Sequence, residues 1–239
     1  SLKELAEEVL RRILELLRRI IEIHERSLER SNRTLKKLID EIERVMREIL
    51  ETLKRALSIK DKEKLKEVRD RLRELLTELL RRAEEIAKEN ERLLRENKKR
   101  LKKIAEELRK LLEDLKRRLS GGPDKLERIL REETKLLEDI LRRIEEVVKE
   151  HEKLNREVLK RLKEILDRTR ELLKKLADED SRDRTLLEEI RRRVEKVIRE
   201  ARETLREHRE RVERSIEELR RMLEDVERIV REAIERLRR

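Results

Sequence analysis

The apolar residues of this chain recur with a period of 18 residues, and this period constrains the fold more than any other feature. From Leu65 to Leu119, successive positions of the apolar face lie 3, 4, 3, 4 and 4 residues apart, and the five steps repeat three times. Eighteen residues in five turns match the 3.6 residues per turn of a straight α-helix. A heptad repeat would instead impose a left-handed supercoil. The pattern therefore predicts long, nearly straight helices.

Three short segments interrupt the pattern, at residues 58–63, 120–125 and 178–183. Gly121 and Gly122 can adopt the left-handed conformation that ends helices, and Pro123 does not continue a helix. Short connections make consecutive helices antiparallel. The sequence predicts an all-α fold, a single-chain, up-down-up-down four-helix bundle that forms one domain over residues 1–239, with helices at 2–58, 62–119, 124–177 and 181–238.

Capping residues stand at the predicted helix starts. Ser, Thr, Asp and Asn accept a hydrogen bond from the first turn, and a Glu three residues later can bond back to the cap. The expected caps are Ser1 with Glu4, Asp124 with Glu127, Asp61, and Asp180 or Ser181.

The composition excludes several classes of protein. There is no Cys, so disulfides and thiolate chemistry are excluded. No apolar run approaches the ~18 residues of a membrane span, and no signal peptide is recognisable. We therefore predict no membrane partner; the compartment is unknown, with a cytoplasmic location expected on recombinant expression.

The net charge of +11 bears on nucleic-acid binding. The densest basic run is Lys98–Lys103, and such a run attracts phosphates. The chain has no aromatic residue that could stack on a base. We expect no specific nucleic-acid partner, only weak, salt-sensitive, non-specific binding.

Polar residues occupy apolar-face positions near the middle of all four predicted helices. Short loops fix the register, and that register brings all three His and all four Asn of the chain to similar heights. Asn32 and Thr204 lie at the edge of the apolar arc. The predicted buried polar network comprises His24, Ser27, Ser31, Asn90, Asn97, His151, Asn155, His208 and Ser215.

Three interpretations of these residues compete. The first is a hydrogen-bond network that specifies register, because a slipped helix would leave buried polar groups unpaired at about 1–3 kcal/mol each. The second is a His-based metal or porphyrin site. However, zinc needs three or four close ligands, and no Asp, Glu or Cys accompanies the histidines in the predicted core. The third is a pH-responsive bundle, because a buried neutral His opposes protonation. The first interpretation predicts no metal and no cofactor.

No enzyme is predicted. The sequence lacks a Ser–His–acid arrangement, a Gly-rich phosphate loop and paired buried carboxylates, so no catalytic residue is assigned.

Self-association depends on the first helix. Leu5, Leu16 and Ile23 widen its apolar arc. They are interpreted as packing at the rim of the bundle or as a weak homodimer contact. No partner is required, and a monomer is predicted.

The chain resembles de novo designed helical bundles with buried hydrogen-bond networks. The resemblance rests on helices of equal length, loops such as Ser120–Asp124, capped starts, Leu/Ile cores without aromatics and polar layers inside the core. It implies a structural scaffold of high thermal stability without an evolved activity.

Overall fold

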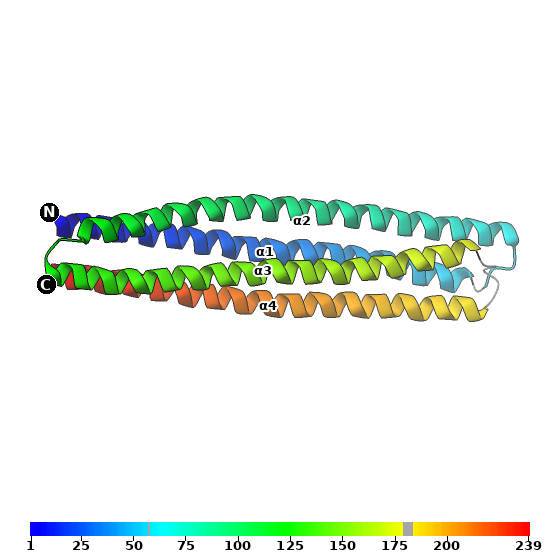
Figure 1. Ribbon diagram of the computed structural model, residues 1–239. Helices are drawn as coiled ribbons and strands as arrows, with labels where there is room; N and C mark the ends of the chain where they lie inside the picture. The colour runs from blue at the N-terminus through cyan, green and yellow to red at the C-terminus, as the bar shows by residue number, and fades with distance from the viewer. Residues whose placement is uncertain (57, 179–183) are drawn as a thin grey trace. The chain divides into compact units, whose positions relative to one another are not determined.

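The chain folds into four antiparallel α-helices (Figure 1). The computed structural model describes residues 1–56, 58–178 and 184–239. The helices are α1 (Leu2–Ala56), α2 (Lys62–Leu119), α3 (Asp124–Asp178) and α4 (Arg184–Arg238). The described residues contain no strand. The predicted all-α four-helix bundle is confirmed.

The contacts of the chain fall into two compact units. Unit 1 comprises Ser1–Arg30, Arg92–Lys153 and Arg211–Arg239, and unit 2 comprises Ser31–Glu91 and Leu154–Glu210. Each unit takes one segment from every helix. Both chain ends and the α2–α3 connection belong to unit 1, whereas the α1–α2 connection belongs to unit 2. The sequence predicts one domain, and the contacts of its bundle group into these two units.

Ion pairs show which helices are neighbours within each unit. In unit 1 the pairs joining α1–α2, α2–α3, α3–α4 and α4–α1 are Arg12–Glu107, Lys98–Glu152, Arg236–Glu132 and Arg18–Glu227. In unit 2 the corresponding pairs are Arg82–Glu41, Arg170–Glu84, Arg161–Glu207 and Arg202–Glu43. Helices that follow one another in the chain are therefore adjacent, and α1 lies diagonally across from α3.

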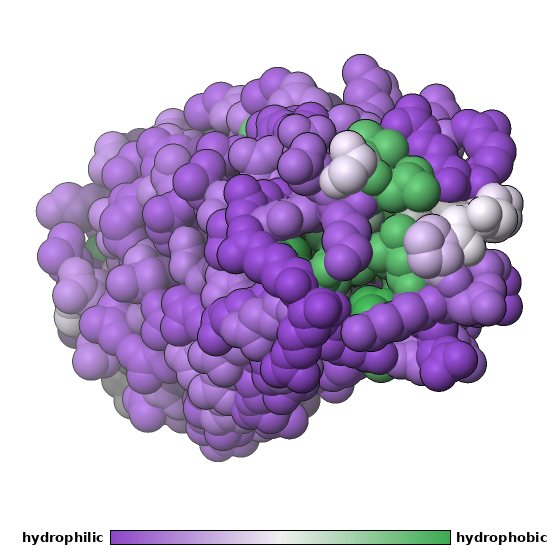
Figure 2. All heavy atoms as spheres, turned by 90° about the vertical axis from the view of Figure 1, so that its left-hand side faces the viewer, coloured by the Kyte–Doolittle hydropathy of each residue, from purple (hydrophilic) through white to green (hydrophobic). Residues whose placement is uncertain are grey.

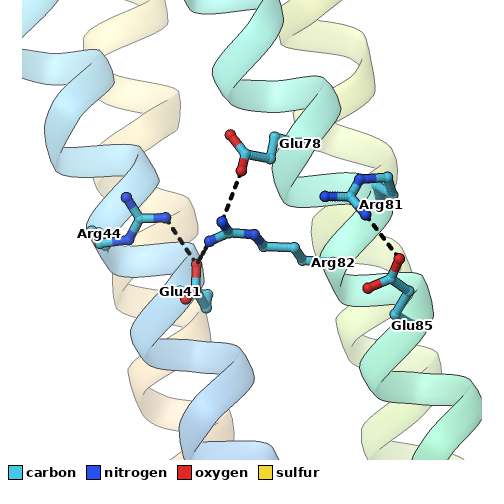
Figure 3. Close-up of polar contacts among 6 residues, drawn as sticks. All are labelled: Glu41, Arg44, Glu78, Arg81, Arg82 and Glu85. Carbon is cyan, nitrogen blue, oxygen red and sulfur yellow. Dashed lines mark hydrogen bonds and ion pairs between the residues drawn. The ribbon is translucent and has the colours of Figure 1, made fainter.

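One of these pairs belongs to a small surface network in unit 2 (Figure 3). Arg82 on α2 lies 3.0 Å from Glu41 on α1 and 2.8 Å from Glu78 on its own helix. Glu41 also accepts a bond from Arg44, and the hydrogen bond from Arg44 is the largest cause of the lowered pKa of Glu41. The network is largely exposed, so its contribution to stability is small.

The α1–α4 surface repeats its ion pairs with the period of the apolar pattern. Three Glu residues of α1 stand 18 residues apart, and so do the three Arg residues of α4 that they contact. The pairs are Glu7–Arg238 and Glu25–Arg220 in unit 1, and Glu43–Arg202 in unit 2. The 18-residue period thus organises surface charge as well as the core.

The apolar face of each helix supplies the core of each unit. Leu10, Ile13 and Leu17 of α1 are fully buried in unit 1, as is Val194 of α4 in unit 2. Leu16, which the sequence places on a widened rim, is 0% exposed and belongs to the core of unit 1. Leu5 and Ile23 are half-buried. Hydrophilic residues cover most of the end of unit 1 that carries the chain termini, with apolar atoms visible in one gap (Figure 2).

Two predicted N-caps form as expected. The Ser1 Oγ accepts a 3.3 Å hydrogen bond from the Glu4 amide, and the Asp61 Oδ1 accepts a 3.1 Å bond from the Glu63 amide. These bonds satisfy amide groups that have no partner inside the helix. The predicted cap at Asp180 or Ser181, and the predicted start of the fourth helix at residue 181, lie outside the described residues.

The α2–α3 connection corrects one predicted cap. Gly121 adopts the left-handed conformation, with φ of +97°, as expected for a residue that ends a helix. The carbonyl of Pro123 accepts a 3.0 Å bond from the Glu127 amide, so Pro123 occupies the cap position and Asp124 is the first helical residue. The predicted Asp124–Glu127 capping box is therefore wrong by one residue. Proline fits there because a cap needs no amide hydrogen.

Candidate functional site: two clusters of buried polar residues

Unit 2 contains a hydrogen-bonded cluster in its core. The Ser31 hydroxyl on α1 donates to the Asn155 Oδ1 on α3, at 3.0 Å. The Nε2 of His208 on α4 lies 3.4 Å from the same Ser31 oxygen. A hydroxyl has one hydrogen, which Asn155 receives, so His208 is the donor to Ser31 and carries its proton on Nε2. All three residues are buried, and the cluster joins three helices inside the apolar core.

A small cavity adjoins this cluster. It has a volume of about 20 Å³, and its polar lining consists of Ser31, Asn90, Asn155 and His208. A cavity needs roughly 10–15 Å³ of such volume to hold one water molecule. The cavity therefore has room for one water molecule and for no larger ligand. Asn90 comes from α2, so all four helices contribute a polar side chain to this part of unit 2.

Unit 1 contains a pair of buried histidines. The rings of His24 on α1 and His151 on α3 meet edge to face, with centroids 5.2 Å apart and planes inclined at 70°. His24 is only 2% exposed, and its Nε2 has no hydrogen-bond partner among the described residues. Burial lowers the pKa of His24 from 6.5 to about 4, because the imidazolium loses its hydration. Ser27, one turn along α1, is also buried.

The remaining predicted residues lie at the margin of the core. Asn90 and Asn97 on α2, and Ser215 on α4, are half-buried. On α2 this is part of a longer stretch, since no residue between Glu84 and Arg100 is buried. The structure thus brings Ser31, Asn155 and His208 together in unit 2, with Asn90 beside them, and brings His24 and His151 together in unit 1.

Sequence reasoning missed several buried polar groups. Thr134 and Thr169 are buried, and each hydroxyl donates to the carbonyl four residues earlier in its own helix, as Thr204 does to Glu200. Their signal was a Thr on the apolar face. Glu133 is buried as well and accepts a 2.9 Å bond from Arg236. Nothing in the sequence distinguished Glu133 from its neighbour Glu132.

The two clusters also define the possible ligand chemistry. Within the described ranges, no three His, Asp or Glu side chains converge as metal ligands. The part of the chain that the structure describes contains no helix with the length and apolarity needed to cross a membrane. Comparisons of the chain with protein families, with curated proteins and with solved structures found no match.

Proposed function

We propose that this protein is a designed structural scaffold without an evolved biochemical activity, and that its buried polar residues specify helix register and pairing. The Ser31–Asn155–His208 cluster carries the proposal. Its three hydrogen-bonding side chains come from three helices and bond to one another inside an apolar core. A change of register would separate these partners and leave polar groups buried without them.

The energetics of such a cluster favour specificity over stability. A satisfied hydrogen bond in a core contributes only about 1 kcal/mol, and replacing both partners by apolar groups of similar shape is often neutral or stabilising. An unsatisfied partner costs about 1–3 kcal/mol. The cluster therefore discriminates against wrong arrangements more than it stabilises the correct one.

The test replaces the cluster by apolar residues, in the triple variant Ser31→Ala, Asn155→Leu and His208→Leu. We expect the free energy of unfolding to stay the same or rise, while light scattering reveals oligomers and NMR spectra reveal more than one state. A clearly destabilised variant that remains one monomeric state contradicts the proposal.

A matched control uses the three buried threonines. The variant Thr134→Val, Thr169→Val and Thr204→Val also removes three buried hydroxyls, but each of them bonds only within its own helix. Because these bonds carry no information about neighbouring helices, we expect this variant to remain a single monomeric species.

A histidine-based ligand site is the second candidate, and the contact between His24 and His151 is the observation that favours it. Zinc or haemin that binds only the folded chain raises the unfolding midpoint, by about 2.7 kcal/mol at a hundredfold excess over the dissociation constant. The scaffold proposal expects no shift with either ligand. A shift that His151→Leu abolishes establishes the ligand site instead.

A further inference from the structure

Unit 1 contains an apolar cavity of about 280 Å³ between α2 and α3. Its buried lining comes from three helices and consists of Ile20, Leu101, Leu141 and Ile144. The half-buried side chains of Ala105 and Val148 complete the apolar walls. Ala105 is the smallest of these residues, so α2 contributes little volume where it faces α3. The cavity is far larger than the one beside Ser31 in unit 2.

The rim of the cavity is predominantly basic. It carries Lys98, Lys102, Arg109 and Lys149 against two carboxylates, Glu145 and Glu152. Two of the cations are paired across the α2–α3 seam. Lys98 lies 3.3 Å from Glu152, and Arg109 contacts Glu145. Lys102 and Lys149 form no ion pair with any described residue, so the rim offers two cations to an anionic group.

We propose that unit 1 binds a small single-chain amphiphile with an anionic head, of the class of medium-chain fatty acids. The alkyl chain occupies the cavity between α2 and α3, and the carboxylate lies at the rim against Lys102 and Lys149. This binding site goes beyond the proposed scaffold function and does not depend on either cluster of buried polar residues.

The size and lining of the cavity fit an alkyl chain. An apolar protein cavity of about 150 Å³ stays dry and takes up benzene. A cavity of 280 Å³ accommodates a longer apolar group. Each methylene that enters an apolar site strengthens binding by about fourfold. The affinity should therefore rise along a series from butanoate to hexanoate to octanoate, and then level off once the chain fills the cavity.

Charge complementarity selects the head group. A carboxylate at the rim gains two partly exposed ion pairs, which together strengthen binding by about fivefold over a neutral head. Salt screens these contacts, so the preference for the anion should decrease as ionic strength rises. A cationic amphiphile with the same chain should bind more weakly than either.

The experiment measures binding of octanoate and of octan-1-ol to the full chain by isothermal titration calorimetry at low salt. We expect saturable binding of one octanoate per chain and weaker binding of octan-1-ol. The variant Lys102→Glu/Lys149→Glu should bind octanoate at least fivefold more weakly and octan-1-ol as the parent does. The matched control Lys160→Glu/Lys163→Glu makes the same charge change at exposed positions in unit 2, and should leave both affinities unchanged apart from a small non-specific effect.

The variant Ala105→Leu tests the cavity itself. A leucine at this position fills the space that the alkyl chain would occupy, so both ligands should lose binding while circular dichroism shows unchanged helix content. The proposal is wrong if octanoate shows no saturable binding, or if folded Ala105→Leu binds it as the parent does. Equal binding of octanoate by the two charge variants overturns the assignment of the head group.

Discussion

The Ser31 hydroxyl on α1 donates a 3.0 Å hydrogen bond to Asn155 on α3, across the diagonal of unit 2. The ion pairs that identify neighbouring helices connect adjacent helices on the surface, whereas this bond connects opposite helices through the core. In unit 1 the corresponding diagonal contact is the edge-to-face pair of His24 and His151. In both units, polar side chains therefore connect the two helices that lie opposite each other.

This diagonal bond predicts strong coupling between Ser31 and Asn155. Ser31→Ala leaves the buried amide of Asn155 without its hydroxyl partner and should lower the free energy of unfolding by about 1–3 kcal/mol. Replacing both, as Ser31→Ala/Asn155→Leu, should recover most of this loss. Guanidinium unfolding of the two single variants and the double variant measures the coupling. Strictly additive losses would show that the bond does not couple the two helices.

The lowered pKa of His24 predicts that stability falls with acid. The unfolded chain takes up a proton near pH 6.5, but the folded chain takes it up only near pH 4. Between these values the unfolded state binds more protons, so the free energy of unfolding decreases as pH falls. At pH 4.5 this one residue should cost about 2–3 kcal/mol relative to pH 7.5.

The variant His24→Leu tests this pH dependence. Its loss of stability between pH 7.5 and 4.5, measured by guanidinium unfolding, should be smaller than that of the parent by about 2–3 kcal/mol. Ser27→Ala, a buried neighbour that does not titrate, should follow the parent profile. Parallel profiles for the parent and His24→Leu would assign the acid sensitivity to other groups.

The Glu133–Arg236 pair should contribute more to stability than an ordinary surface pair. The Glu133 side chain is 7% exposed, whereas Arg236 is 36% exposed. Arg236→Met leaves the Glu133 carboxylate buried without this partner, and should cost about 1–3 kcal/mol. Arg142→Met breaks an exposed pair with Asp139 on α3 and should cost less than about 1 kcal/mol. Thermal unfolding of the two variants compares them directly, and equal losses would contradict the burial argument.

The α2–α3 connection offers a test with two adjacent glycines. Gly121 has a positive φ, and a Cβ added to it would have no heavy atom within 4 Å, so Gly121→Ala introduces backbone strain and no clash. The expected loss is about 1 kcal/mol. Gly122 does not have a positive φ, and Gly122→Ala should be neutral or stabilising by up to about 1 kcal/mol. The order of the two unfolding midpoints decides the matter, and a more stable Gly121→Ala would reject it.

Local signals in the sequence predicted the helices well. Ser1 and Asp61 cap helices because a cap depends only on residues within one turn of it. The cap at the third helix was misplaced by one residue because a proline carbonyl can accept the first helical bond as well as any other carbonyl can. The end of α1 at Ala56, two residues before the predicted position, is a further small difference.

The polar residues were predicted less completely, for a physical reason. Periodicity indicates which face of a helix a residue lies on, but not how closely a neighbouring helix packs against that face. Asn90 and Asn97 lie on the apolar face of α2 and are only half-buried, since α2 has no buried residue in that stretch. Partners also depend on register. The sequence placed His151 and His208 at one height, whereas His151 contacts His24 and His208 contacts Ser31.

The repeated ion pairs between α1 and α4 resemble a ruler with identical marks. If α4 slid along α1 by one 18-residue interval, Arg238 would stand where Arg220 now meets Glu25, and Arg220 would stand where Arg202 meets Glu43. Two of the three pairs would re-form, so this surface is nearly degenerate between the correct alignment and the shifted one. Only residues that do not repeat can remove the degeneracy. Eighteen residues after Ser31 the chain has Ile49, which has no hydroxyl to offer Asn155.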